Sequence, residues 1–199
     1  MRISRFFIVL TALAVAACSQ ISLLKPGTHE IGGTYTVQSA GTWNRIELGN
    51  HVSWTIDGPS LQTLVFYSNI GDGENIFRIE GSSDGPTAIY EKMPKFRTGM
   101  TAPEIGELLV ATMAQIGDSG VTVVSLVPAK FGARDGFRQE LRYQDKDGLK
   151  RRAIFLGVET GDKLHLILYA APEVHYFERD RAQAEQIMRS VRFLPNASS

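Results

Sequence analysis

The sequence predicts one α+β domain in which helices pack on an antiparallel sheet. Three observations lead to this prediction. Apolar and polar residues alternate along several segments, with the period of two that a half-buried strand requires. In the second half of the chain, short polar turns separate consecutive segments of this kind, which favours antiparallel pairing of neighbours. Two other segments carry apolar residues at helical spacing, so each can pack one face on the sheet.

The first 17 residues are typical of a bacterial export signal. Arg2 and Arg5 precede an apolar run, residues 6–17, that is too short to remain as a membrane-spanning helix. The run ends in Val15-Ala16-Ala17-Cys18, and small residues before a chain's single cysteine resemble the lipobox of bacterial lipoproteins. That resemblance implies cleavage before Cys18, a thioether-linked diacylglycerol on its sulfur and acylation of the new amine. An uncleaved membrane anchor or a buried N-terminal helix is the alternative.

The same resemblance implies where the protein is located. In Gram-negative lipoproteins a residue such as Ser19 beside the cysteine permits transfer to the outer membrane, so we expect a lipid-anchored protein that faces the periplasm. Acylation leaves no thiol for a disulfide or a metal. Residues 19–33 combine glycine and proline with few large apolar side chains, so we expect residues 18–33 to be the lipidated cysteine and a tether.

The charge of the mature chain argues against one class of partner. Loss of Arg2 and Arg5 leaves 19 basic against 21 acidic residues, a formal net charge of −2. A chain without a basic excess lacks the attraction that drives binding to a phosphate backbone, so we expect no nucleic acid partner. The expected partners are the membrane, through the lipid, and an envelope protein or a small ligand.

Residues 34–195 have the length and apolar content of one globular domain, and residues 196–199 form a polar tail. The first half of this domain is rich in strand signals. Trp43 and Trp54 could form a ligand platform, but indoles on alternating strands belong more often to the core. The strand patterns of this half cover residues 35–37, 43–48, 52–56 and 61–67.

Glycines and prolines interrupt the pattern over residues 69–100, where only residues 76–79 and 88–90 could pair as short strands. An irregular region this long in a compact domain is mobile or functional, so we expect a contact surface here. The alternative is that its large side chains pack on the sheet. The expected contact loop consists of Lys92, Met93, Lys95, Phe96 and Arg97.

Acidic residues and histidines offer weak metal-site signals. Asp72, Glu74 and Asp84 lack the regular ligand spacing of a calcium loop, so we expect solvated turns. His175 and Glu178 stand three residues apart and could share a helix face, but two ligands are too few for a stable site. We therefore expect no metal and no cofactor.

Thr101-Ala102-Pro103-Glu104 predicts the start of a helix. In this capping box the Thr101 hydroxyl and the Glu104 carboxylate each satisfy a backbone N–H of the other residue. Pro103 lacks an N–H that the first turn does not need. Apolar residues then follow at helical spacing as far as Gly117, a natural stop.

The densest strand signals follow this helix and predict an antiparallel meander. The first of its strands is expected to stop at Pro128, and Pro172 is expected to open a last helix with an apolar stripe. Residues 193–194 could add a short edge strand. The meander strands cover residues 121–127, 137–143, 149–158 and 164–171.

This order of elements resembles a known fold. A β-rich first half, a capped helix, a meander and a last helix that runs into Ser190-Val191-Arg192-Phe193 are similar to the PsbP-like and DcrB-like α/β/α sandwich proteins, over residues 34–194. The resemblance implies a PsbP-like sandwich. Because that fold occurs in bacterial lipoproteins and in auxiliary subunits of larger assemblies, it also implies a non-catalytic binding or assembly role.

Two short blocks resemble the catalytic blocks of GDSL hydrolases. Gly117-Asp118-Ser119 is similar to the nucleophile block, and Asp162-Lys163-Leu164-His165 is similar to the Asp-x-x-His block. The resemblance implies a small esterase that uses Ser119 and His165. That family places its nucleophile block near the start of the domain after a parallel strand, whereas His165 is expected in an antiparallel strand. We therefore expect no catalytic residue and keep this esterase as the alternative function.

Overall fold

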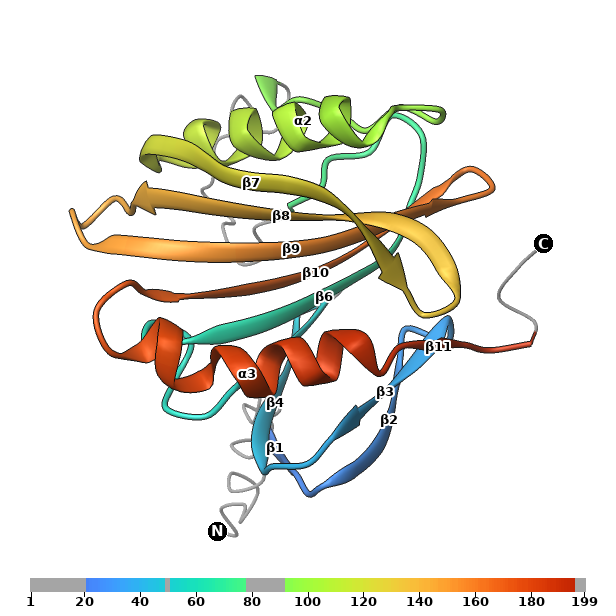
Figure 1. Ribbon diagram of the computed structural model, residues 1–199, viewed down its shortest axis with the longest axis vertical. Helices are drawn as coiled ribbons and strands as arrows, with labels where there is room; N and C mark the ends of the chain where they lie inside the picture. Colours follow the sequence, from blue (N-terminus) through green and yellow to red (C-terminus); the bar gives the residue numbers. More distant parts are fainter. Residues whose placement is uncertain (1–20, 49–50, 78–91, 196–199) are drawn as a thin grey trace, which may run out of the picture.

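The computed structural model describes residues 21–48, 51–77 and 92–195, and its centre is an eight-stranded antiparallel sheet (Figure 1). Across this sheet the order is β1 (Ile21–Leu24), β4 (Trp43–Leu48), β5 (His51–Thr55), β6 (Thr63–Ile70), β10 (Lys163–Pro172), β9 (Lys150–Thr160), β8 (Arg134–Gln144) and β7 (Ser119–Phe131). A smaller sheet combines β11 (Arg192–Phe193), β3 (Tyr35–Ser39) and β2 (Gly27–Ile31).

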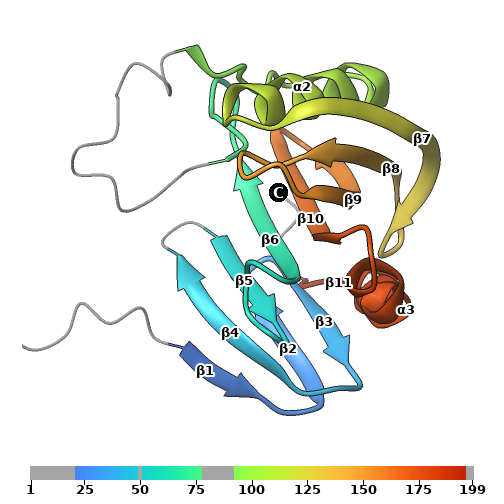
Figure 2. The same ribbon diagram turned by 90° about the vertical axis from the view of Figure 1, so that its left-hand side faces the viewer.

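Two helices in the described part of the chain, α2 (Ala102–Gln115) and α3 (Tyr176–Arg189), cover opposite faces of the large sheet (Figure 2). Alternating side chains of β9 show this division. Ile154 and Leu156 join the core beneath α3, whereas Phe155 joins the core beneath α2. The predicted α+β class, with helices packed on an antiparallel sheet, is therefore confirmed. Neither helix is long and apolar enough to cross a membrane.

The capping box at the start of α2 forms as expected. The Thr101 hydroxyl accepts a hydrogen bond from the Glu104 N–H at 3.5 Å, and the Glu104 carboxylate accepts one from the Thr101 N–H at 2.7 Å. The helix ends at Gln115, and Gly117 follows with a φ of 105°, a conformation that suits glycine. Both ends of α2 are therefore set by local sequence.

The meander is confirmed, but prolines do not delimit it as expected. Pro128 lies inside β7, which continues to Phe131, because β7 is an edge strand where a missing N–H need not break a ladder. Pro172 is the last residue of β10, opposite Arg151, and α3 begins only after His175. The expected apolar stripe is buried: Phe177, Ala184, Ile187 and Met188 lie in α3, and Val191 follows its end.

The tether prediction is wrong for residues 21–33. β1 pairs with β4 and β2 pairs with β3, and Ile31 is only 1% exposed in the core beneath α3. These short strands have little apolar alternation of their own, and their pairing with distant strands outweighs local preference. The folded domain therefore includes β1 and β2. Cys18, Ser19 and the expected tail, residues 196–199, lie outside the described residues.

Candidate functional site

The expected contact loop is largely a packing element. Met93 is 3% exposed and Phe96 is fully buried in the core beneath α2, so neither can line a surface. Backbone hydrogen bonds from Gly73 to Phe96 and from Phe96 to Glu74 hold the segment in place. Lys92, Lys95 and Arg97 are exposed, and Arg97 pairs with Asp72 at 3.2 Å. The prediction that Met93 and Phe96 belong to a contact surface is thus wrong, and the alternative, that they pack in the core, is confirmed for these two side chains.

Other expectations for residues 69–100 have mixed outcomes. Ile76 and Phe77 are buried but belong to no strand, whereas residues 78–79 and 88–90 lie outside the described residues, as does Asp84. Asp72 accepts a hydrogen bond from the Thr98 N–H at 3.0 Å. Glu74 accepts one from the Gly71 N–H at 3.0 Å. These carboxylates therefore stabilise turns.

Histidine and carboxylate ligands do not gather in the described residues, where no group of three or more could hold a metal ion. His175 precedes α3 with a φ of 71°, and its ring contacts Tyr176 edge-on. Glu178 pairs with Arg152 at 2.6 Å and with Arg181 at 3.6 Å. His175 makes no side-chain capping hydrogen bond, and Glu178 is engaged by two arginines.

The residues of the esterase hypothesis are far apart. Ser119 is an exposed residue opposite Gln144, at the end of the meander where Lys150 begins β9. His165 pairs with Val158, eight residues further along β9, which is roughly 25 Å at about 3.3 Å per residue. No shared active site is possible, so the esterase hypothesis for these residues is wrong.

His165 instead belongs to the interior. Its Nδ1 accepts a hydrogen bond from the Asn69 N–H at 3.2 Å, and its Nε2 lies 2.9 Å from the Thr160 hydroxyl. Burial, with a smaller effect from Arg134, lowers the pKa of His165 to about 4. The ring is therefore neutral near pH 7 and links β10 to its neighbours.

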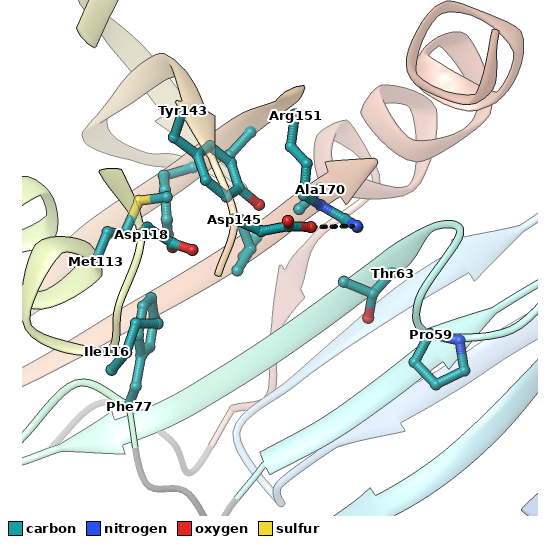
Figure 3. A pocket seen from close by; sticks show the side chains of 13 residues that line it. Pro59, Thr63, Phe77, Met113, Ile116, Asp118, Tyr143, Asp145, Arg151 and Ala170 are labelled. Atoms are coloured by element: carbon teal, nitrogen blue, oxygen red, sulfur yellow. Dashed lines mark hydrogen bonds and ion pairs between the residues drawn. The ribbon is translucent and has the colours of Figure 1, made fainter. Parts of the chain in front are cut away.

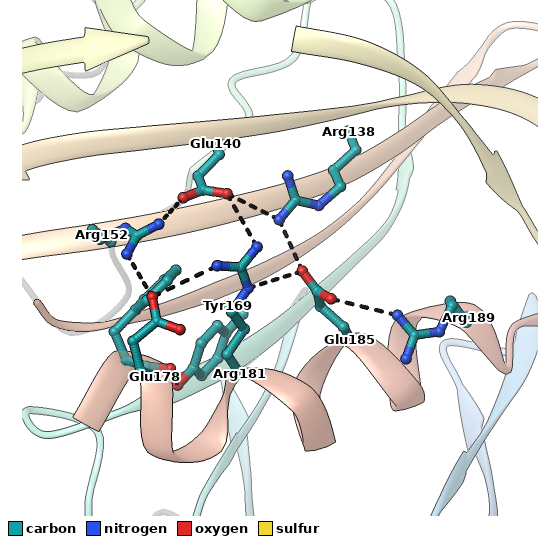
Figure 4. Close-up of polar contacts among 9 residues, drawn as sticks. Arg138, Glu140, Arg152, Tyr169, Glu178, Arg181, Glu185 and Arg189 are labelled. Atoms are coloured by element: carbon teal, nitrogen blue, oxygen red, sulfur yellow. Dashed lines mark hydrogen bonds and ion pairs between the residues drawn. The ribbon is translucent and has the colours of Figure 1, made fainter. Parts of the chain in front are cut away.

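An ion-pair cluster joins α3 to the sheet (Figure 4). Its centre is Glu140 of β8, whose side chain is 5% exposed and contacts Arg138, Arg152 and Arg181. Burial alone would raise the pKa of Glu140, but hydrogen bonds from Arg152 and Arg138 outweigh it and lower that pKa. Arg152 also lies over the Phe177 ring, 4.3 Å from its centroid. Since every member has a partner, the cluster fixes α3 on the sheet.

The best candidate for a ligand site is a pocket of about 240 Å³ between the end of α2 and the sheet, named here the Asp118 pocket (Figure 3). Its floor is apolar, and Phe77 stacks with Phe155 at a centroid distance of 6.4 Å. Its rim carries polar and charged groups. The lining residues are Pro59, Thr63, Phe77, Met113, Ile116, Asp118, Tyr143, Asp145, Arg151, Ala153, Phe155, Leu168 and Ala170.

Two of the charged rim residues have structural partners. Asp145 accepts hydrogen bonds from the Asp147 N–H at 3.1 Å and the Leu149 N–H at 2.9 Å, which closes the turn between β8 and β9. Arg151 donates to the Ser60 carbonyl at 2.9 Å and pairs with Asp145 at 3.5 Å. Both side chains are therefore held in place beside the pocket.

Asp118 differs from its neighbours on the rim. Its half-buried carboxyl accepts no hydrogen bond and forms no ion pair among the described residues, although its N–H donates to the Met113 carbonyl at 3.1 Å. Burial and then the negative charge of Asp145 raise its pKa to about 6, while Arg151 acts in the opposite direction. Burial also raises the pKa of Tyr143 to about 12. Asp118 is thus a charged rim group with unused hydrogen-bonding capacity.

Sequence reasoning missed this pocket. From the sequence, Asp118 belongs only to the hydrolase-like block Gly117-Asp118-Ser119, and Asp145 belongs to no expected site. One signal was present: an antiparallel meander places the end of the preceding helix and the turn at residues 145–148 at the same end of the sheet. That arrangement brings Asp118 and Asp145 together.

A second hollow, of about 440 Å³, lies between α2 and the edge strand β7. Val110, Ala111 and Ala114 of the helix face Val123 and Leu126 of the strand across it. Its walls are mainly apolar. Its acidic lining residue, Glu107, is exposed to solvent, whereas the carboxyl of Asp118 is half-buried.

Comparisons with known proteins identify the fold. No protein-family model and no curated protein sequence matches the chain. Cyanobacterial PsbP (CyanoP) from Synechocystis sp. PCC 6803 is similar in structure, with a TM-score of 0.54 and 10% identity, over 94% of this chain and 99% of that one. A protein from Bacteroides thetaiotaomicron VPI-5482 has a TM-score of 0.50 and 12% identity over 88% of this chain, which spans 51% of that protein. The chain therefore has a PsbP-like fold.

Proposed function

We propose that this protein is a non-catalytic binding module of the bacterial cell envelope, anchored by lipid on Cys18 and facing the periplasm. The lipobox-like residues before Cys18 support the anchor, and Ser19 supports the outer membrane as its location. The PsbP-like fold is consistent with a non-catalytic module. An envelope protein or a small ligand remains the expected partner, and the Asp118 pocket favours the small ligand.

The observation that carries the binding role is the unpartnered carboxyl of Asp118 above an apolar floor. A carboxylate in this position has lost part of its hydration and gained no donor in return. Arg151, the one cation among the described residues that line the pocket, is already bound to Ser60 and Asp145. A ligand with a cationic amine and an apolar body would supply the missing donor and fill the floor. We therefore propose an apolar amine as the ligand class.

Calorimetric titration with phenethylamine tests this proposal. The matched neutral compound 2-phenylethanol should bind much more weakly, and 3-phenylpropionate should not bind. Asp118→Asn should weaken phenethylamine binding roughly tenfold or more, because a hydrogen bond to a charged group is worth about 1.5–3 kcal/mol. Asp135→Asn, which changes a carboxylate with 92% side-chain exposure, is the matched control and should bind like the wild type.

The outcome against the proposal is equally definite. If the three compounds bind alike, or if Asp118→Asn leaves the affinity for phenethylamine unchanged, the pocket does not select cations. Affinity should also fall as the pH drops below about 6, because protonation removes the negative charge of Asp118. A flat pH profile between about 5 and 8 would contradict the assigned role of this carboxyl.

A further inference from the structure

The first described strand exposes large apolar side chains. Ile21 is 65% exposed and Leu23 is 64% exposed, and alternate residues of a strand lie on the same face. Among the described residues, β1 is an outermost strand whose one neighbour in the sheet is β4. Ile21 lies opposite the half-buried Ile46, which extends this apolar strip by one strand. Exposed apolar groups gathered in this way are typical of a contact surface.

The position of β1 in the chain indicates what it contacts. Only three residue steps separate Cys18 from Ile21, which limits the distance between their Cα atoms to about 11 Å. The polar headgroup layer of one leaflet is about 5–8 Å thick. An acylated cysteine lies at this layer because its chains enter the hydrocarbon. Ile21 is therefore held at or just above the lipid surface, with no room for a long tether.

We propose that the outer edge of β1 rests on the membrane, with Ile21 and Leu23 inserted at the boundary between headgroups and acyl chains. This inference depends on the acylation of Cys18 in the proposed function. Two or more acyl chains already give stable attachment, so these side chains set the orientation of the domain instead of its affinity for the membrane. Lys25, exposed directly after β1, would lie at the level of anionic headgroups.

This orientation directs the rest of the molecule away from the lipid. Figures 1 and 2 place β1 and α2 at opposite ends of the longest axis. The other exposed edge, β7, carries Val123, Val124 and Val127 and lies near α2. β7 is the edge of the sheet opposite β1, so its valines supply a matched control on the same sheet. Contact with lipid is thus expected at β1 and not at β7.

Fluorescence quenching by brominated lipid tests the orientation. The full-length acylated protein, with Leu23→Trp or with Val124→Trp, is reconstituted in vesicles of phosphatidylethanolamine and phosphatidylglycerol whose acyl chains are brominated near their carboxyl ends. Native Trp43 and Trp54 are fully buried, and the wild-type protein corrects for their emission. The added tryptophan at position 23 should lose emission relative to unbrominated vesicles, whereas that at position 124 should keep it.

The controls separate this inference from the proposal on which it rests. Mass spectrometry of the same preparations reports acylation of Cys18, and a chain without acyl groups would overturn both proposals. An acylated chain whose added tryptophan at position 23 is quenched no more than that at position 124 would overturn the β1 inference alone. If Leu23→Trp fails to fold, Ile21→Trp replaces it, because its side chain has the same exposure and lies on the same face.

Discussion

Replacing Asp118 by asparagine is expected to stabilise the protein above pH 6. The folded state raises the pKa of this carboxyl from 3.8 to about 6, so folded protein holds the proton more tightly than unfolded protein. Below pH 3.8 the carboxyl is protonated in both states, so it does not lower the free energy of unfolding. As the pH rises from 3.8 to about 6, stability falls, and above pH 6 the full cost is present. Asparagine imitates the neutral form and removes this cost.

The size of the effect follows from the pKa. Each tenfold change in an acid dissociation constant is worth about 1.4 kcal/mol, so the rise to about 6 sets an upper limit of about 3 kcal/mol. Asp118 is only half-buried, and water near the carboxylate reduces the effect to about 1–2 kcal/mol. The substitution should remove few stabilising interactions, since the carboxyl accepts no hydrogen bond from the described residues.

Urea unfolding at about pH 4 and about pH 8, followed by the fluorescence of Trp43 and Trp54, measures this difference. Both indoles are buried and should report loss of the core. We expect Asp118→Asn to raise the free energy of unfolding at the higher pH and to match the wild type at the lower one. Asp135→Asn, at a highly exposed position, should match the wild type at both. A variant of Asp118 that is no more stable at about pH 8 would refute the reasoning.

Three further predictions concern stability and use the same unfolding assay. Ile31→Ala should cost about 2–4 kcal/mol because Ile31 is 1% exposed, whereas an unchanged midpoint would show that β2 is not part of the domain. Gly157→Ala should cost about 1–3 kcal/mol because the new Cβ would lie 2.5 Å from Phe137 and 2.6 Å from Leu166, and wild-type stability would contradict this packing. Glu140→Gln should cost about 3 kcal/mol near pH 7 because three guanidinium groups lose their carboxylate. That cost should shrink as the pH falls below the ordinary range of glutamate, since the pKa of Glu140 is lowered, and a cost independent of pH would contradict the ion-pair assignment.

Features that depend on neighbouring residues could be predicted from the sequence. The capping box needs only Thr101 and Glu104, which stand three residues apart. The meander strands follow one another, so their alternation and the turns between them specify both strands and pairing. The predicted strand end at Pro128 was wrong because a proline is tolerated within β7, an edge strand, and the edge position is a property of the whole sheet.

Features that depend on distant pairing could not be predicted in this way. β1 has a weak pattern, and its pairing with β4 joins Ile21 to Ile46, 25 residues later. Whether Met93 and Phe96 face solvent or the core depends on whether an apolar surface of the folded domain lies beneath them. The Asp118 pocket combines the end of α2 with a turn more than 25 residues further along the chain. Local periodicity therefore does not indicate sites that are assembled from separate segments of the chain.

The most direct test of the account is the mass of the mature N-terminal peptide, measured on protein expressed with its own signal in a Gram-negative host and isolated from the membrane fraction. We predict a peptide that begins at Cys18 and carries a diacylglycerol and an amide-linked acyl chain. Cys18→Ala protein should be absent from that fraction as an acylated species. An unmodified Cys18 in membrane-bound protein, or a mature chain that retains residues 1–17, would contradict the lipid-anchored binding module.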